Sequence, residues 1–424
     1  MELLEEILSR DNLNEAYKRV VANKGAGGVD GVTVEELKAY LSEHGGELIE
    51  SIRERKYKPQ PVLRVEIAKE NGKVRKLGIP TVVDRVIQQA IMQVLSPIYE
   101  KQFSNSSYGF RVGRSCEMAV TRSLELINDG YGWIVDIDLE RFFDTVHHDR
   151  LMNIISRTVT DGDVVSLIRK FLVSGVMVQG KYEDTPIGTP QGGNLSPLLS
   201  NIMLNELDKE LEARGLSFVR YADDCNVFVK SEKAADRVMR SITDFIQRKL
   251  GLIVNTEKSR IGRPTSIKFL GFGYFAGKDG KWYAKPHKTS IMKLKRKLKA
   301  LTKRSWSISL DTRLWKLKQL IVGWLNYFRI AKMKTVLARI DEKLRKRIRV
   351  IIWKQWKKTM KRYDSLRKLG ANHRNAYRTA NCRKSYQFVY GTATIHSALN
   401  NERLKQRGLV SLSDHFNRVH LITI

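Results

Sequence analysis

Two adjacent aspartates inside an apolar stretch constrain the fold of this chain more than any other feature. Residues 218–230 read FVRYADDCNVFVK, with β-branched and aromatic residues on both sides of Asp223 and Asp224. Apolar runs around a short polar break predict a β-hairpin with the acids at its turn. Neighbouring carboxylates repel each other, and a bound divalent cation such as Mg²⁺ removes that cost because it prefers oxygen ligands. A solvated turn is the common fate of an isolated Asp-Asp pair, so the context decides.

A second acidic strand is predicted upstream of this hairpin. Residues 133–144 read WIVDIDLERFFD and carry Asp138 at the end of an apolar run. If the two strands are neighbours in one sheet, Asp138 meets Asp223 and Asp224 across it. Three carboxylates placed in this way can hold two Mg²⁺ ions about 4 Å apart, the arrangement that serves in-line phosphoryl transfer.

Taken together, these motifs closely resemble the active site of reverse transcriptases. The resemblance rests on the sequence YADD at 221–224, on Asp138 and on the double phenylalanine that follows it. It implies an α+β right-hand polymerase, with fingers and a palm that contain antiparallel sheet, followed by an α-helical thumb and a small C-terminal DNA-binding region. It also implies that Asp138 and Asp223 bridge the two Mg²⁺ ions, with Asp224 in support.

A basic hairpin is predicted between residues 62 and 80. Asn71-Gly72 separates two alternating segments there, which is a strong hairpin signal, and several Lys and Arg residues decorate the strands. On composition alone, the alternative is a solvated charged ribbon. Reverse transcriptases have a fingers hairpin at this place, and Lys69 and Arg75 match its triphosphate-contacting positions. A helix is expected over residues 82–103.

Three further residues acquire nucleotide-binding roles through the resemblance. Phe143 lies five residues after Asp138, where the family screens the sugar 2′ carbon, and a bulky ring there would exclude a ribose 2′-hydroxyl. Gln191 belongs to a PQGG loop that matches the nucleotide pocket, and a helix capped by Ser196 is expected to follow. Lys258 corresponds to a basic residue near the leaving pyrophosphate.

Other motifs favour structural roles. His147 and His148 are interpreted as surface or helix-cap residues, because no second His/Cys cluster accompanies them. The glycine-rich segment 25–31 lacks the order of a nucleotide P-loop and is interpreted as a turn. The three cysteines lie far apart and form no CxxC pair, so neither a disulfide framework nor a zinc knuckle is indicated. A reducing, cytoplasmic compartment in a bacterium fits that pattern, with the protein bound to nucleic acid.

The charge of the chain predicts a polyanionic partner. The formal net charge is +31 over 424 residues, and residues 281–368 alone contain 29 Lys or Arg against 4 Asp or Glu, an excess of 25. Long helical patterns with one apolar stripe and a dense basic face begin near residue 286. They predict a bundle with a basic wall for nucleic acid, or a basic bundle without a specific ligand. The predicted nucleic-acid contacts are Arg111, Arg114, Lys295, Arg296, Lys299 and Lys303.

The second half of the chain narrows the resemblance to one family. Residues 269–272 match the family's primer-gripping turn, residues 323–328 (GWLNYF) resemble the maturase domain of group II intron proteins, and residues 401–412 resemble their DNA-binding region. The chain therefore resembles a bacterial group II intron-encoded reverse transcriptase and maturase. No nuclease segment with paired cysteines follows, which predicts the endonuclease-lacking type that primes at an existing 3′ end.

The resemblance implies five domains and two activities. The expected domains are an N-terminal extension at 1–22, fingers at 23–131, a palm at 132–283, a helical thumb or maturase domain at 284–363 and a DNA-binding region at 364–424. The activities are target-primed copying of intron RNA into cDNA, from deoxynucleoside triphosphates on a DNA primer, and binding of the intron RNA to assist splicing.

Alternatives to this function remain open on the sequence. One is a splicing-only RNA-binding maturase, and another is a retron or diversity-generating reverse transcriptase, against which the long basic thumb argues. No membrane partner is expected, because no apolar run is long enough to span a bilayer and no signal peptide is present. The oligomeric state is left open by the sequence.

Overall fold

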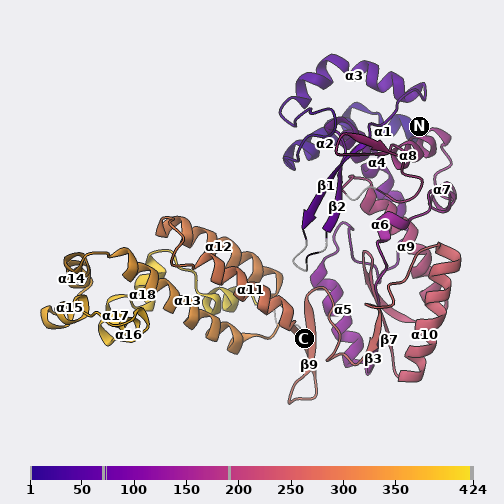
Figure 1. The fold of residues 1–424 in the computed structure, drawn as a ribbon. Coiled ribbons are helices and arrows are strands. Elements are labelled where there is room, and N and C mark those ends of the chain that lie inside the picture. The colour runs from indigo at the N-terminus through magenta and orange to yellow at the C-terminus, as the bar shows by residue number, and fades with distance from the viewer. Residues whose placement is uncertain (1, 69–71, 73, 190–191, 421–424) are drawn as a thin grey trace. The chain divides into compact units, whose positions relative to one another are not determined.

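The computed structural model describes residues 2–68, 72, 74–189 and 192–420, and of Arg75 it describes the backbone alone. The chain folds into two compact units, Met1–Pro264 and Thr265–Ile424, which Figure 1 colours from indigo to magenta and from orange to yellow. Lys69 and Gln191, two of the predicted nucleotide contacts, lie outside the described residues.

Three helices begin the first unit: α1 (Leu3–Ile7), α2 (Arg10–Ala22) and α3 (Leu37–Arg53). The N-cap of α2 is Ser9, whose side chain accepts the amide of Asn12, and Asp11 lies within the first turn. A hydroxyl before the helix can reach the orphan amides of that turn, whereas a carboxylate already inside it cannot take the same geometry.

The predicted basic hairpin is confirmed as a strand pair. Strands β1 (Val62–Ala68) and β2 (Val74–Ile79) are antiparallel, in register from Leu63 opposite Ile79 to Ala68 opposite Val74. Strands β4 (Val176–Val178) and β5 (Lys181–Glu183) extend this sheet in the order β2-β1-β4-β5. Of the turn residues between 68 and 74, only Gly72 is described.

Helices cover and connect the sheets of the first unit. The predicted helix from residue 82 ends three residues early, at Glu100, and its N-cap is Thr81. The helix after the PQGG loop starts at Ser196, so Ser196 is its first residue while Leu195 occupies the cap position. The helices are α4 (Val82–Glu100), α5 (Cys116–Asn128), α6 (Phe142–Thr145), α7 (His148–Ser156), α8 (Gly162–Leu172), α9 (Ser196–Ala213) and α10 (Glu232–Phe245), which continues as one π-helical turn over Ile246–Leu250.

A four-stranded antiparallel sheet forms the centre of the first unit. Its strands are β3 (Trp133–Ile137), β6 (Ser217–Tyr221), β7 (Asp224–Val229) and β8 (Arg260–Gly262), in the order β6-β7-β3-β8. Residues 225–229 of β7 are all buried, because this central strand is covered on both faces, and helices α5, α9 and α10 pack against the sheet. The predicted hairpin and the predicted pairing of the two acidic strands are both present.

The second unit contains a strand pair and a helical array. Strands β9 (Phe272–Ala276) and β10 (Trp282–Pro286) pair antiparallel. Three long helices follow, α11 (Lys288–Leu301), α12 (Leu310–Tyr327) and α13 (Lys334–Gln355). Short helices complete the unit: α14 (Thr359–Lys368), α15 (His373–Ala380), α16 (Tyr386–Tyr390), α17 (Ala393–Ala398), α18 (Asn401–Gln406) and α19 (Leu412–Val419).

The predicted apolar stripes of the long helices face the interior of the second unit. Leu298, Ile321 and Ile348, one from each helix, are at most 5% exposed. On α12, Leu325 is fully buried and its neighbour Trp324 is half-buried. Within the described ranges, every helix is too short or too polar to cross a lipid bilayer.

A buried carboxylate joins the last helix of this unit to α13. Asp341 is 2% exposed and accepts the amides of Leu412 and Ser413, both at 2.8 Å, and the hydroxyl of Ser411 at 3.2 Å. These amides belong to the first turn of α19, where backbone donors lack partners inside the helix. A side chain from another helix therefore supplies part of the N-terminal cap of α19.

We expect Asp341→Ala to lower the free energy of unfolding of the second unit by about 2–4 kcal/mol, because buried amides lose a charged acceptor. Thermal or urea unfolding of the full chain measures this loss. Glu342→Ala is the matched control, since Glu342 is the exposed neighbour on the same helix. Equal stability of the two variants would contradict the assigned role.

Candidate active site

Strand register brings two of the predicted aspartates to neighbouring positions. Strands β3 and β7 pair from Trp133 opposite Val229 to Ile137 opposite Cys225. Asp138 follows Ile137, and Asp224 precedes Cys225. These two aspartates are therefore the next pair in the same antiparallel register. Asp138 is half-buried and Asp224 is exposed. The sheet thus places both acids at one end of its two central strands.

The third aspartate lies in the turn of the β6–β7 hairpin. Tyr221 pairs with Asp224, which leaves Ala222 and Asp223 as a two-residue loop. Ala222 has φ of 55°, in the left-handed region that a residue with a Cβ seldom adopts. Asp223 is half-buried there. Burial raises the pKa of the neighbouring Cys225 thiol and of the Tyr221 phenol, so both groups stay neutral beside the acids.

The hairpin turn rests against a segment from a distant part of the chain. The amide of Tyr108 donates to the carbonyl of Arg220 at 2.9 Å, and the amide of Arg220 donates to Ser106 at 2.9 Å. Gly109 comes next, and a Cβ added to it would lie 2.3 Å from the backbone nitrogen of Ala222. Only glycine lets the two backbones approach this closely.

Arg220 holds this turn from inside the protein. Its side chain is fully buried and forms a bidentate ion pair with Asp208, at 2.7 and 2.5 Å. Its Nη1 also donates to the carbonyl of Ala222 and to Asn201 Oδ1, both at 3.0 Å. Asn201 in turn donates to the carbonyl of Gly109 at 2.8 Å. One guanidinium therefore fixes both the loop that carries Asp223 and the segment that supports it.

The sequence analysis did not identify Arg220, Asp208 or Asn201 as part of the site. Arg220 stands in an otherwise apolar strand, and a charge there signals a buried partner. Asp208 and Asn201 lie on one helix, α9, seven residues apart, a spacing that keeps them on one face. Both patterns are visible in the sequence, but nothing in the sequence shows which acid pairs with Arg220.

Lys258 lies in the site, in contact with the first aspartate. Its Nζ is 3.0 and 3.4 Å from the two carboxylate oxygens of Asp138. Neighbouring residues hold the backbone of Asp138: the amide of Asn255 donates to its carbonyl at 2.8 Å, and Ser259 Oγ accepts its amide at 3.0 Å. Asp136 lies two residues earlier on β3, and its carboxylate pairs with Arg260 at 3.4 Å. This ion pair is in keeping with a structural role for an acidic residue within a strand.

The donor set suits a hard divalent cation. Asp138, Asp223 and Asp224 offer carboxylate oxygens alone, the ligands that Mg²⁺ prefers, and the ammonium of Lys258 shows that a cation is accommodated against Asp138. In the described part of the chain, no group of three or more His, Cys, Asp or Glu side chains stands ready to hold a metal ion. The acids share one end of the sheet without being gathered as a finished metal centre.

Phe143 follows Asp138 by five residues and is hydrogen-bonded through its backbone to the segment that leads to Gln191. It is half-buried and meets Phe142 edge-on, with 5.2 Å between ring centroids. Its carbonyl accepts the amide of Thr189 at 2.6 Å. The carbonyl of Gly188 lies 2.6 Å from His148 Nε2. The segment that enters the PQGG loop is thus hydrogen-bonded to the Phe143 helix and to the helix after it.

His148 differs from its sequence-based interpretation. It is 5% exposed and contacts the Gly188 carbonyl, so it is a buried structural residue and not a surface residue. His147 precedes α7 and is exposed, as expected. The amphipathic helix α7 buries the side on which His148 lies, and a hydrogen bond compensates the imidazole for lost water.

Arg111 has a structural role in place of the predicted contact with nucleic acid. Its side chain is 3% exposed, pairs with Glu100 at 2.6 Å, and donates to the carbonyls of Ser104 and Ser107. These bonds leave little of the guanidinium for a ligand. Arg114 is more accessible: it donates to Asn105 at 2.9 Å and lies over the ring of Tyr108. Arg75 occupies β2 opposite Ile67.

The predicted primer-gripping turn forms in the second unit. Phe269 and Phe272 exchange two backbone hydrogen bonds, of 3.1 and 2.8 Å. The two residues between them, Leu270 and Gly271, have φ of 49° and 83°, the conformation of a tight two-residue hairpin turn. The Tyr327 hydroxyl donates to Leu270 O at 2.8 Å. Helix α12 thereby supports a turn that holds Leu270 in the left-handed conformation.

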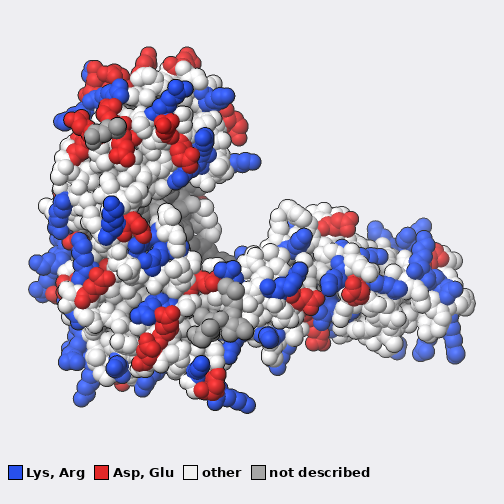
Figure 2. Space-filling model, turned by 180° about the vertical axis from the view of Figure 1, so that it is seen from behind, with Lys and Arg blue, Asp and Glu red and all other residues white. Residues whose placement is uncertain are grey.

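The predicted basic contacts of α11 are all exposed. Lys295, Lys299 and Lys303 follow one another at intervals of four residues, and Arg296 lies beside them. The first two share a helix face, and Lys303 follows in the turn after α11. Figure 2 shows Lys and Arg side chains spread over the visible face of the second unit, with acidic side chains between them.

We expect Arg220→Met to destabilise the first unit by about 3–5 kcal/mol, because it leaves Asp208 buried without its counter-charge. Differential scanning calorimetry of the full chain measures the shift. Arg248→Met is the control, since Arg248 forms an exposed ion pair with Asp244, which contributes at most about 1 kcal/mol. Recovery of most of the stability in Arg220→Met with Asp208→Leu would identify the unpaired charge as the cause. A single variant as stable as the control would contradict it.

Comparisons with known proteins agree with this geometry. A family model for reverse transcriptase (RNA-dependent DNA polymerase) matches residues 67–274, and a model for the group II intron, maturase-specific domain matches residues 291–370. Protein YkfC of Escherichia coli (strain K12) is 35% identical over 299 residues, which cover 61% of this chain and 78% of that protein. Group II intron-encoded protein LtrA of Lactococcus lactis subsp. cremoris is 40% identical over 204 residues, 48% of this chain and 34% of that protein.

Solved structures resemble the fold only distantly. Telomerase from Candida albicans, in complex with a TWJ fragment of telomeric RNA, has a TM-score of 0.44 and 14% identity, over 75% of this chain and 66% of that one. A partial Cas6-RT-Cas1–Cas2 complex has a TM-score of 0.38 and 24% identity, over 60% and 44%. The chain spans about a third of the length of LtrA and most of the length of YkfC. The assignment to a family rests on the two sequence-family matches. The chain belongs to the bacterial group II intron-encoded reverse transcriptases, RNA-directed DNA polymerases that carry a maturase domain.

Proposed function

We propose that this chain copies the RNA of its parent intron into DNA, starting from the 3′ end of a DNA target strand. The substrates are an RNA template, a DNA primer and deoxynucleoside triphosphates. The observation that carries the proposal is the register of β3 and β7, which continues from Ile137 and Cys225 to Asp138 and Asp224. With Asp223 in the adjoining turn, three carboxylates serve one end of the sheet.

Asp138, Asp223 and Asp224 are the residues that would hold two Mg²⁺ ions. When bound, such ions lower the pKa of a primer 3′-hydroxyl and neutralise charge on the departing pyrophosphate. Lys258 supplies a further positive charge at the edge of the site, where it now pairs with Asp138. An ammonium in that position can bind the leaving pyrophosphate once the aspartate has another cation.

Other residues of the first unit would select and orient the nucleotide. Phe143 would exclude a 2′-hydroxyl by contact with the sugar, and its backbone bond to Thr189 couples it to the loop that carries Gln191. Lys69 and Arg75 would bind the triphosphate, and Arg75 belongs to strand β2 of the basic hairpin. These assignments extend the family's pattern to the matching positions of this chain.

A second function is supported by the maturase-specific match over residues 291–370. We propose that the basic helices bind the parent intron RNA and help it to splice, and that residues 364–424 bind the DNA target. Splicing is chemistry done by RNA, so a protein helper needs complementary shape and charge but no metal pair of its own. Both reactions use transcripts and DNA of the bacterial cytoplasm, where we place the protein.

We expect Asp223→Asn with Asp224→Asn to abolish cDNA synthesis but still to promote splicing of the parent intron. Loss of two metal ligands removes several kcal/mol of transition-state stabilisation, a decrease of more than about a thousandfold in extension. Primer extension and a splicing assay at low Mg²⁺, run on the same preparations, measure the two activities.

Two controls accompany this double variant. Asp236→Asn removes an exposed acid on α10 and should leave both activities intact. Neutralising Lys295, Arg296, Lys299 and Lys303 together should impair both, because both require bound RNA. Wild-type-like extension by the acidic double variant would overturn the catalytic assignment, and loss of its splicing while it still binds RNA would show that the functions are not separable.

We expect Phe143→Ala to raise the incorporation of ribonucleotides relative to deoxyribonucleotides by about tenfold or more, since relief of a steric clash is worth on the order of 1–3 kcal/mol. Single-nucleotide extension with each triphosphate measures the ratio. Phe143→Tyr keeps the ring and should keep the wild-type ratio. If Phe143→Ala has the wild-type ratio as well, another residue screens the sugar.

A further inference from the structure

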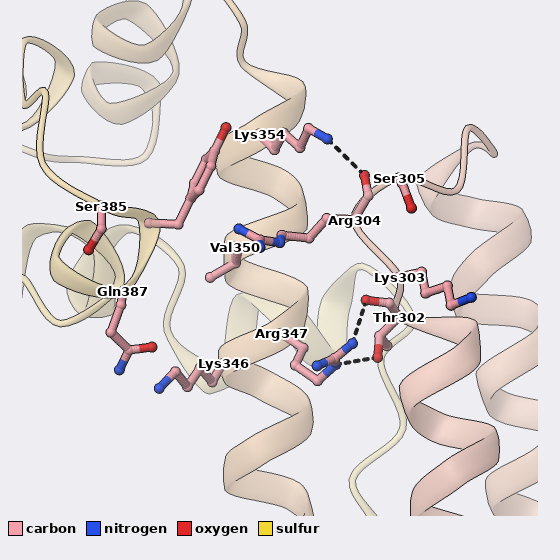
Figure 3. Close-up of a pocket in the computed structure, with 11 residues that line it drawn as sticks. Thr302, Lys303, Arg304, Ser305, Lys346, Arg347, Val350, Lys354, Ser385 and Gln387 are labelled. Atoms are coloured by element: carbon pink, nitrogen blue, oxygen red, sulfur yellow. Dashed lines mark hydrogen bonds between the residues drawn. The ribbon is translucent and has the colours of Figure 1, made fainter.

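A basic cavity of about 900 Å³ lies within the second unit, and one of the predicted nucleic-acid contacts, Lys303, is among the residues that line it. Its walls come from the loop after α11, from one face of α13 and from the start of α16. Figure 3 shows that the labelled side chains of α13 and of the loop border the same space. The volume lies in the range of sites that hold small organic ligands, about 300–1,000 Å³.

Of the residues that the structure describes, five cations and no carboxylate line this cavity. They are Lys303, Arg304, Lys346, Arg347 and Lys354. In the described part of the chain, none of the five pairs with an Asp or Glu. Burial, followed by the charge of Arg304, lowers the pKa of Arg347, as expected where like charges converge. The unbalanced charge favours a ligand with several negative charges.

Some of these cations build the walls and others remain available. Arg347 donates to the Thr302 hydroxyl at 2.5 Å and to the carbonyls of Thr302 and Lys299 at 3.0 and 3.2 Å, which joins α13 to the end of α11. Lys354 donates to the carbonyl of Arg304 at 3.1 Å. Figure 3 draws the bonds from Arg347 to Thr302 and from Lys354 to Arg304 as dashed lines. The loop is therefore held in place independently of any ligand.

An aromatic ring completes the cavity. Tyr386 is half-buried at the start of α16, and the guanidinium of Arg304 lies 5.1 Å from the centre of its ring. Lys346 lies 5.0 Å from the ring of the nearby Tyr390. Cations interleaved with aromatic rings suit a strand that offers phosphates and unstacked bases. A duplex offers phosphates but keeps its bases stacked within the helix, so it would leave the ring unused.

We propose that this cavity binds an unpaired segment of a nucleic-acid strand, with phosphates on Lys346 and Arg304 and a base on Tyr386. The site is distinct from the α11 face and from the aspartates, although Lys303 borders both the cavity and that face. The proposal rests on the proposed function only in taking nucleic acid as the partner. RNA and DNA strands share the recognised chemistry, and the experiment distinguishes them.

The test measures affinity of the full chain for a short single-stranded oligoribonucleotide and for the DNA strand of the same sequence, by fluorescence anisotropy over a range of salt concentrations. Each lost phosphate contact lowers the slope of log affinity against log salt by about 0.7 for single strands. The double variant Lys346→Gln with Arg304→Gln should therefore flatten the slope by about 1.4. Its matched control is Arg339→Gln with Lys343→Gln, two exposed residues of α13 outside the cavity.

Variants of Tyr386 separate stacking from charge. Tyr386→Leu should weaken binding roughly tenfold with no change in slope, because the lost contact is not ionic. Tyr386→Phe keeps the ring and should bind within about twofold of the wild type, which also shows that the position tolerates substitution. An effect on the RNA strand, the DNA strand or both supports the site and names its ligand.

Three results would overturn the proposal. The first is a control pair that flattens the slope as much as the cavity pair, and the second is a Tyr386→Leu variant that binds as the wild type does. The third is a change of affinity for a blunt duplex alone. Primer extension on an annealed template and primer is measured in parallel. If the wild-type chain binds the single strand through Tyr386 but extends no primer, the cavity proposal stands and the polymerase assignment is disproved.

Discussion

The buried ion pair between Arg220 and Asp208 is the interaction on which the geometry of the candidate active site depends. The turn that carries Asp223 contains a left-handed alanine, which the backbone would not adopt without support. Arg220 supplies that support through the Ala222 carbonyl, and Asn201 extends it to Gly109. A charge taken out of water is costly unless each donor has a partner. The network meets that condition with one acid, one amide and backbone carbonyls, so it fixes a single position of the turn.

Positive charge has two different uses in this protein. In the first unit, buried guanidinium groups such as Arg220 and Arg111 are paired and hold loops together. In the second unit, Arg347 and Lys354 hold a loop through backbone carbonyls, and among the described residues no acid lines the cavity beside the remaining cations. Paired charges specify structure, whereas unpaired charges favour a polyanion. The same residue types therefore hold loops together in one unit and leave a surface suited to a polyanion in the other.

The ion pair between Lys258 and Asp138 combines the two uses of positive charge, because Lys258 is paired with an acid and is also exposed. A lysine that contacts the carboxylate lowers the repulsion among neighbouring acids before any substrate arrives. The contact is half-exposed and so contributes little to stability. It can be exchanged for stronger partners at little cost, which is the property that a residue near a departing anion requires.

The sequence by itself determined the elements and the family. Alternation around the two aspartates predicted the hairpin, the apolar run before Asp138 predicted its neighbour strand, and helical stripes predicted the three long helices of the second unit. These patterns are local, because side-chain periodicity follows from backbone geometry. The motifs YADD and PQGG, with their spacing, were sufficient to identify a reverse transcriptase.

Only the tertiary structure decided which polar residues form ion pairs and hydrogen bonds with one another. The sequence offered Arg111 and Arg114 as similar basic residues, and burial against Glu100 separated them. It treated His148 as a surface or helix-cap residue and gave no partner for Arg220. Gly188, Asp208 and Asn201 come close to these two residues only through folding. The cavity at Tyr386 likewise joins three segments that are far apart in the chain. Pairing energies depend on distance and burial, and neither quantity is encoded in local sequence.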